Sequence, residues 1–161
     1  MIAIPEIEQL IERLRETCGT FYGQRLVSLV VFGSVGRGTP RPDSDVDLLV
    51  VADPLPDGRI PRVREFEEVE RSVAVNPSMG GAHRLSPIFK TPAEVRRGSP
   101  LFLDMLDDGR LLYDRDGFFA KELAALRERL DKLGAKRIWK GTAWYWDLKP
   151  SFKPGDEIVL F

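Results

Sequence analysis

The twenty residues from Val31 to Val50 read VFGSVGRGTPRPDSDVDLLV. An apolar run stops at Gly33 and Ser34, and a second apolar run begins around two aspartates, Asp45 and Asp47, that stand one residue apart. Because successive side chains of a strand point to opposite faces, these aspartates project from the same face, with Cα atoms roughly 7 Å apart. Like charges at the mouth of a core are costly, so the pair needs either basic side chains or a bound cation.

The residues that flank this stretch predict two neighbouring strands. Residues 25–32 are apolar and β-branched with little alternation, which is typical of a strand covered on both faces. A second strand is predicted over residues 45–52, and the prolines between the two strands confine residues 39–42 to a loop. The first strand would therefore deliver a glycine–serine turn, and the second would deliver both carboxylates.

The rest of the chain alternates helices with short extended segments. Apolar side chains at spacings of three and four predict helices over residues 5–18, 61–73 and 119–133. Val63 is expected on the buried face of the second helix, Asp116 as the cap of the third and Gly134 as its end. Helices interleaved with a few strands indicate an α/β or α+β fold, in which helices pack on a sheet.

Weaker signals lie between and beyond the predicted helices. The segment 76–81 is expected to end the second helix, and residues 83–89 to form a strand that Pro87 confines to an edge or a bulge. A short helix is predicted over residues 99–109, closed by Gly109, and a short extended piece over residues 110–114.

The composition is that of one globular domain in the cytoplasm. A chain of 161 residues with 43% hydrophobic and 30% charged residues suits a single core. A net charge of −1 gives no general attraction to nucleic acid or to an anionic membrane, and the single Cys18 fits a reducing compartment. No apolar run approaches the ~20 residues of a membrane-spanning helix, and the N-terminus lacks the pattern of a signal peptide. We therefore expect a cytoplasmic protein with no membrane partner.

Residues 135–161 differ in character from the domain predicted over residues 1–134. The segment holds all three tryptophans of the chain and five basic residues. Such a mixture can stack bases and follow a nucleic acid backbone. It is also typical of short strands and turns, or of an arm that packs on the domain or on a partner. Packing is favoured because the whole chain is not basic, so nucleic acid is a possible but unfavoured partner. An oligomer is compatible with the sequence.

The turn and the paired aspartates fit a metal-bound triphosphate. Gly33 lets the backbone approach a ligand, and a helix that begins there presents free N–H groups to phosphate. The hydroxyl of Ser34 adds a donor, and Arg37 adds charge. Asp45 and Asp47 supply the hard oxygen ligands that Mg²⁺ prefers. The glycine spacing is neither that of a Walker A loop nor that of a dinucleotide-binding fingerprint.

Each of these residues also has a simpler structural interpretation. The aspartates can be a salt-bridged strand end, Gly33 a tight turn, Arg37 a solvated loop residue and Ser44 a turn residue that bonds its own backbone. His83 is the single histidine. With no cysteine or other histidine nearby, a zinc site is not expected there.

Gly33-Ser34, ten intervening residues and Asp45-x-Asp47 resemble the signature of the polymerase-β-like nucleotidyltransferases, in particular their minimal nucleotidyltransferase branch. The similarity is specific over residues 25–52, where it includes Arg37 and Ser44 as nucleotide-binding candidates. It implies a short mixed sheet flanked by helices, the palm-like fold of polymerase β. It also implies Mg²⁺ on the two aspartates, and the β- and γ-phosphates of ATP or another nucleoside triphosphate on Gly33 and Ser34.

The resemblance further implies transfer of a nucleoside monophosphate, in the first place AMP, to a hydroxyl, with pyrophosphate leaving. The acceptor hydroxyl would lie on a protein, an RNA end or a small molecule. Members of the minimal branch are similar to antitoxins that pair with a HEPN-domain toxin. A HEPN-type protein is therefore an attractive partner and acceptor.

The third carboxylate that active members carry on the next strand is not evident in this sequence. The inward position of the strand predicted over residues 83–89 is Ser86, and a serine is a poor Mg²⁺ ligand and a poor base. The enzyme could work with two carboxylates, or another acid such as Glu94 or Asp104 could fold into the site. The alternative function is a nucleotide- or partner-binding module with weak or no catalysis.

Overall fold

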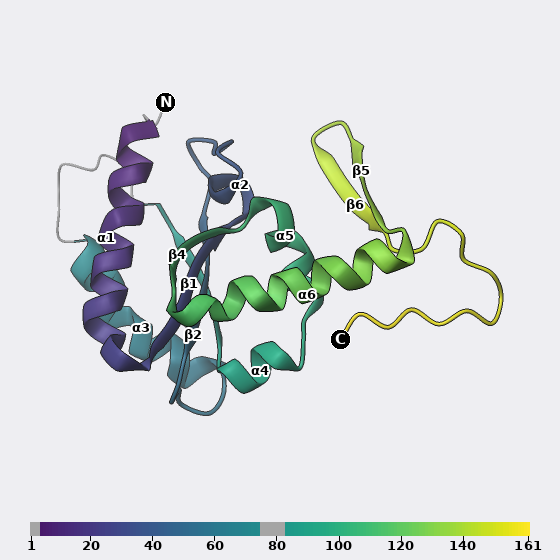
Figure 1. Ribbon diagram of the computed structural model, residues 1–161. Coiled ribbons are helices and arrows are strands. Elements are labelled where there is room, and N and C mark those ends of the chain that lie inside the picture. The colour runs from purple at the N-terminus through teal and green to yellow at the C-terminus, as the bar shows by residue number, and fades with distance from the viewer. Residues whose placement is uncertain (1–3, 75–82) are drawn as a thin grey trace.

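The computed structural model describes residues 4–74 and 83–161 (Figure 1). The helical elements, with η for a 3-10 turn, are α1 (Ile4–Tyr22), η1 (Gly23–Arg25), α2 (Gly33–Gly36), α3 (Arg59–Ala74), α4 (Pro92–Arg96), η2 (Pro100–Asp104), α5 (Met105–Asp108), η3 (Arg115–Gly117) and α6 (Phe118–Leu133). The strands are β1 (Leu26–Phe32), β2 (Val46–Ala52), β3 (Leu85–Lys90), β4 (Arg110–Asp114), β5 (Lys136–Lys140) and β6 (Ala143–Asp147). Within the described parts of the chain, no helix has the length and apolar character needed to cross a membrane.

The centre of the molecule is a mixed four-stranded sheet in the order β3-β2-β1-β4. β1 runs antiparallel to both β2 and β4, whereas β2 and β3 are parallel. The expected fold class, a short mixed sheet flanked by helices, is confirmed. β3 lies at an edge of the sheet, which is the position that Pro87 predicts.

Helices cover the sheet on both faces (Figure 1). On one face, Leu29 and Val31 of β1 pack in a core with residues of α1 and α3. On the other face, Val30 of β1 and Leu49 of β2 pack with residues of α6 and of the η2–α5 segment. The near-continuous apolar sequence of β1 and β2 follows from this double burial, because strands covered on both faces have no polar side.

Two predicted helix boundaries differ from the structure. α1 continues four residues beyond Cys18 to Tyr22, whose ring is 2% exposed and extends the buried stripe past Gly19. α3 begins at Arg59, and Val63, predicted to be buried, is exposed, whereas the neighbouring Arg62 is buried. That prediction was wrong because Arg62 finds acceptors inside the fold. The segment predicted to end this helix lies outside the described residues.

The start of α6 also differs from the prediction. The predicted cap, Asp116, has φ +55° and lies in the preceding turn. The carboxylate of Asp114 accepts instead, from the backbone N–H of Phe119 at 2.9 Å and of Ala120 at 3.0 Å. The end of the helix is confirmed at Gly134, which has φ +71°.

The C-terminal segment contains the β5–β6 hairpin and an extended run that returns to the domain. Three side chains of this segment pack against the core that contains residues of α6, namely Trp146, Leu148 and Leu160. Arg129 of α6 donates a hydrogen bond to the carbonyl oxygen of Leu160 at 2.9 Å. The short strands and turns predicted for this segment are confirmed. The domain boundary at residue 134 stays a prediction.

Candidate active site

The carboxylate of Asp47 lies directly against the turn at Gly33. Gly33 has φ +67°, a conformation that favours glycine, and a Cβ at this position would lie 2.3 Å from Oδ2 of Asp47. In the register of β1 and β2, Asp47 stands opposite Phe32, the last residue before the turn. The fold therefore requires a glycine at residue 33 for two reasons, its backbone conformation and its contact with the carboxylate.

Asp45 and Asp47 carry negative charge that the described side chains do not compensate. Asp45 is exposed immediately before β2, and Asp47 is partly buried within the strand. Burial raises the pKa of Asp47, and the nearby charges of Asp45 and Asp104 raise it further. Over residues 4–74 and 83–161, no ion pair joins either aspartate to a basic side chain. A salt-bridged strand end is therefore not what this part of the structure shows.

This pair fits a divalent cation that is shared with a ligand. Uncompensated carboxylates at a partly buried position favour a bound positive charge, and Mg²⁺ commonly takes one or two carboxylates together with substrate phosphates. Among the described residues, no group of three or more Asp, Glu, His or Cys side chains is arranged to hold a metal ion. Two aspartates and phosphate oxygens are thus the donor set that the site can offer.

The phosphate-binding candidates lie in α2, a single helical turn. Ser34 is partly exposed in its first half, and Val35 anchors the turn in the core at 4% exposure. The backbone N–H groups at the start of a helix have no partner within the helix, so they are available to a ligand. A Cβ on Gly36 would lie 2.2 Å from the carbonyl oxygen of Asp108, so α2 is packed tightly on α5.

Arg37 is held at the end of α2 by a buried carboxylate. Its Nη1 donates to Oδ2 of Asp108 at 2.8 Å, and Arg137 of β5 donates to the same oxygen at 2.7 Å. Burial alone would raise the pKa of Asp108, but the hydrogen bonds from Arg137 and Arg37 outweigh it and hold the pKa below its usual value. The predicted charge of Arg37 is thus placed beside the turn and already has one protein partner.

Ser44 and His83 organise the loop that precedes Asp45. The hydroxyl of Ser44 accepts from the backbone N–H of Arg41 at 2.8 Å, which is the turn role anticipated for it. Nδ1 of His83 lies 3.3 Å from the carbonyl oxygen of Ser44. Both residues contact the loop backbone and so fix the approach of the chain to β2.

The position beside Asp47 on the next strand is Ser86, as predicted, because the two residues pair in the parallel register of β2 and β3. Of the two acids considered as replacements, Asp104 is the one whose charge reaches Asp47. Asp104 ends η2 and is partly buried, and burial raises its own pKa while Arg137 opposes this effect. Asp104 therefore belongs to the same electrostatic environment as the paired aspartates.

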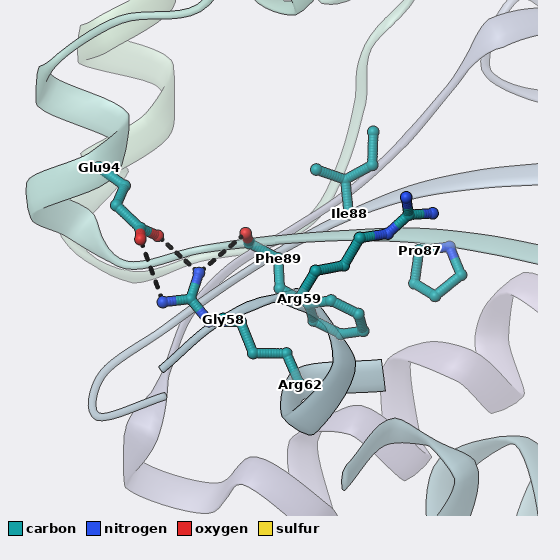
Figure 2. A pocket seen from close by; sticks show the side chains of 7 residues that line it. All are labelled: Gly58, Arg59, Arg62, Pro87, Ile88, Phe89 and Glu94. Atoms are coloured by element: carbon teal, nitrogen blue, oxygen red, sulfur yellow. Dashed lines mark hydrogen bonds and ion pairs between the residues drawn. The ribbon is translucent and has the colours of Figure 1, made fainter. Parts of the chain in front are cut away.

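Glu94 has a different, structural role (Figure 2). Its oxygens accept from Nη1 and Nη2 of Arg62 at 2.8 and 3.0 Å, and Arg62 also bonds the carbonyl of Phe89. Glu94 closes a capping box at the start of α4 with Thr91. The hydrogen bond from Arg62 is the main cause that lowers the pKa of Glu94 to about 2. This pair lines a surface pocket of about 510 Å³ that also contains Arg59 and Pro87.

Sequence reasoning missed the link between α2, α5 and the hairpin. Asp107 and Asp108, next to Gly109, have the pattern of an exposed helix end, yet Asp108 is 6% exposed. Its partners Arg37 and Arg137 lie 71 and 29 residues away in the chain. No local pattern indicates a contact at such separations.

Comparison with known proteins identifies relatives of this chain. The sequence model of the nucleotidyltransferase domain family matches residues 11–130. A protein of Methanocaldococcus jannaschii, described as a protein adenylyltransferase, is 30% identical over 129 residues, which cover 79% of this chain and 85% of the relative. A crystal structure of a toxin–antitoxin with AMP-PNP has the same fold, with a TM-score of 0.50 and 15% identity over 77% of this chain and 92% of that chain. A crystal structure described as a nucleotidyltransferase of Sulfolobus solfataricus is 20% identical over 72% of this chain and 90% of that chain, with a TM-score of 0.45.

Proposed function

Because the chain belongs to the nucleotidyltransferase domain family, we propose that this nucleotidyltransferase moves AMP from ATP to a hydroxyl on a partner protein and depends on Mg²⁺. The observation that carries the proposal is the uncompensated carboxylate of Asp47 against the Gly33 turn. Adenylyl transfer to a protein is supported by the relative described as a protein adenylyltransferase. A HEPN-type protein is the partner that the resemblance to the minimal branch favours.

The residues of the site divide the work of the reaction. Gly33 and Ser34 bind and orient the β- and γ-phosphates through backbone N–H groups and the serine hydroxyl. Asp45 and Asp47 would hold Mg²⁺, which when bound would supply positive charge for the phosphates and the leaving pyrophosphate. Holding the triphosphate in line with the acceptor removes much of the entropic barrier to transfer.

We assign the proton of the acceptor hydroxyl to Asp104. The acceptor oxygen forms a bond to the α-phosphorus, the bond to the bridging oxygen of the β-phosphate breaks, and pyrophosphate leaves with that electron pair. The assignment is supported by the charge of Asp104, which contributes to the raised pKa of Asp47, and by Ser86, which lies beside Asp47 and is a poor base at neutral pH. Replacing Asp104 by Asn should therefore remove transfer while ATP binding is retained.

A labelling experiment tests the proposal. The protein is incubated with Mg²⁺, a candidate HEPN-type partner and ATP that carries the label on either the α- or the γ-phosphate. We expect the α-label to reach the partner and the γ-label to remain in pyrophosphate. The variants Asp45→Asn and Asp47→Asn should lose transfer, and Asp43→Asn, an exposed acid in the preceding loop, should retain it. Transfer that survives both site variants would refute the assignment.

The second candidate function is a nucleotide-binding module, and the serine that faces Asp47 favours it. A module of this kind would bind ATP with Mg²⁺ through the same aspartates but would transfer no label to any partner. Equilibrium binding measured together with the labelling assay separates the two functions. ATP binding that depends on Asp47, without transfer in the unmodified protein, would select the binding module.

A further inference from the structure

The β5–β6 hairpin has one aromatic face. In the antiparallel register, Arg137 pairs with Trp146 and Trp139 pairs with Trp144, so these four side chains lie on the same side of the hairpin. Trp146 packs against the core that contains residues of α6. Trp139 is 50% exposed near the free end of the hairpin, and an exposed indole is a large apolar surface.

The aromatic face is connected to the candidate site through a single carboxylate. Arg137 donates to Asp108 at 2.7 Å, and Asp108 accepts from Arg37 of the phosphate turn at 2.8 Å. Arg137 also influences the pKa of Asp104, which in turn acts on Asp47. In Figure 1 the hairpin rises from the end of α6 on the side of the molecule where α2 and α5 lie. The base of the hairpin is therefore linked to the phosphate turn through α5.

Arg137 contacts Trp139 and Trp144, the two tryptophans nearer the free end of the hairpin. Its Cζ atom lies 4.1 Å from the ring centroid of Trp144 and 4.8 Å from that of Trp139, distances at which a cation and an aromatic ring attract. Asp107 and Asp108 pair with the guanidinium, so its charge is taken up within the protein. The hairpin thus presents an exposed indole ring whose neighbouring guanidinium is already paired with carboxylates.

We propose that the exposed ring of Trp139 stacks on the base of the nucleoside triphosphate whose phosphates bind at Gly33 and Ser34. This inference rests on the proposed function and adds the base-binding wall of the site. The base is favoured over a separate macromolecule because Arg137, which contacts both rings, and Arg37, at the end of the phosphate turn, donate to the same carboxylate oxygen of Asp108. An indole offers a π surface to any base, so ATP and GTP should bind with similar affinity.

The tryptophans make the proposal directly measurable, because all three of them lie in the hairpin and Trp139 is the one that is 50% exposed. The protein is titrated with ATP, GTP and inorganic tripolyphosphate in the presence of Mg²⁺, with affinities from calorimetry. Both nucleotides should quench the fluorescence, whereas tripolyphosphate should bind without quenching. Trp139→Ala should weaken ATP binding about tenfold and leave the tripolyphosphate affinity unchanged.

A matched control is Tyr145→Ala. Tyr145 is 46% exposed on the opposite face of the hairpin, so its loss should leave both affinities unchanged. Trp139→Phe keeps an aromatic ring and should retain most of the ATP affinity, which separates stacking from a folding defect. Equal weakening by Trp139→Ala and Tyr145→Ala would overturn the proposal, because it would indicate an effect on the hairpin as a whole.

The remaining outcomes separate this inference from the proposed function. If Trp139→Ala binds ATP as well as the unmodified protein while Asp47→Asn does not, the base-binding role is wrong and the site assignment stands. If Trp139→Ala binds ATP normally but loses label transfer to the partner protein, the aromatic face contacts the acceptor and the inference is overturned. If the unmodified protein binds neither ATP nor tripolyphosphate, the proposed function itself fails.

Discussion

Replacing Gly33 by alanine tests the contact between the turn and Asp47. With φ +67°, an alanine costs about 1–2 kcal/mol in backbone strain. The new Cβ would lie 2.3 Å from Oδ2 of Asp47, so the carboxylate must also leave its preferred rotamer, at about 1 kcal/mol. Gly33→Ala should therefore lower the free energy of unfolding by about 2–3 kcal/mol and displace the carboxylate to which we assign the metal.

A double-mutant cycle isolates the contact from the strain. In an Asp47→Ala background the Oδ2 atom is gone, and the Cβ of residue 47 would be at an ordinary 3.6 Å. Gly33→Ala should then cost only the strain, about 1–2 kcal/mol. Urea unfolding followed by circular dichroism measures all four proteins. Gly38→Ala is the control, since Gly38 has φ +75° and no atom within 4 Å of its Cβ position.

The cycle has a clear refuting outcome. The cost of Gly38→Ala should be equal in both backgrounds, whereas the cost of Gly33→Ala should be smaller by about 1 kcal/mol when Asp47 is absent. If Gly33→Ala costs the same in both backgrounds, the carboxylate does not lie against the turn. The geometry on which the site depends would then be wrong.

Three further predictions concern the ion pairs of Glu94 and Asp108 and the third-carboxylate position, which Ser86 occupies. The pKa of Glu94 is lowered to about 2 from an ordinary 4.5, so the stability that its charged form contributes is present above about pH 4.5 and is lost as the pH falls towards 2. Glu94→Gln should therefore destabilise the protein by on the order of 3 kcal/mol at pH 7 and by little at pH 2, as measured by urea unfolding at both pH values. Asp108→Asn removes the charge between Arg37 and Arg137 and should lower the free energy of unfolding by about 3 kcal/mol in the same assay. The control Glu8→Gln, at an exposed ion pair with Arg110, should cost less than about 1 kcal/mol, and equal costs would contradict a buried ion pair at Asp108. Ser86→Asp places a third carboxylate beside Asp47, so repulsion between like charges should lower the melting temperature without Mg²⁺, and added Mg²⁺ should restore it. A fall in melting temperature that Mg²⁺ does not reverse would argue against a metal at this position.

The strands and their relation to the aspartates were predictable from local sequence. β1 and β2 are apolar along their whole length because both faces are covered, and this pattern is visible without knowledge of the neighbours. The two-residue period of a strand placed Asp45 and Asp47 on one face. The resemblance to the nucleotidyltransferases directed that face to the turn and identified Ser86 as the inward residue of the next strand, where it pairs with Asp47.

Features set by contacts between distant segments were not predictable. Arg62 is buried because Glu94 and backbone carbonyls receive its guanidinium, so the apolar pattern of α3 misplaced Val63. α6 is capped by Asp114, which is the last residue of β4, and its position relative to the helix depends on the turn between them. The same reason applies to Asp104, whose electrostatic effect on Asp47 depends on the position of the η2–α5 segment.

The central claim is that Asp45 and Asp47 hold a metal-bound triphosphate against the turn at Gly33 and Ser34. A crystal structure with Mg²⁺ and a non-hydrolysable ATP analogue tests it most directly. We predict Mg²⁺ at about 2.1 Å from oxygens of both aspartates, with the β- and γ-phosphates on the turn. A nucleotide bound elsewhere, for example in the pocket beside Arg59 and Arg62, with no metal on either aspartate, would contradict the claim.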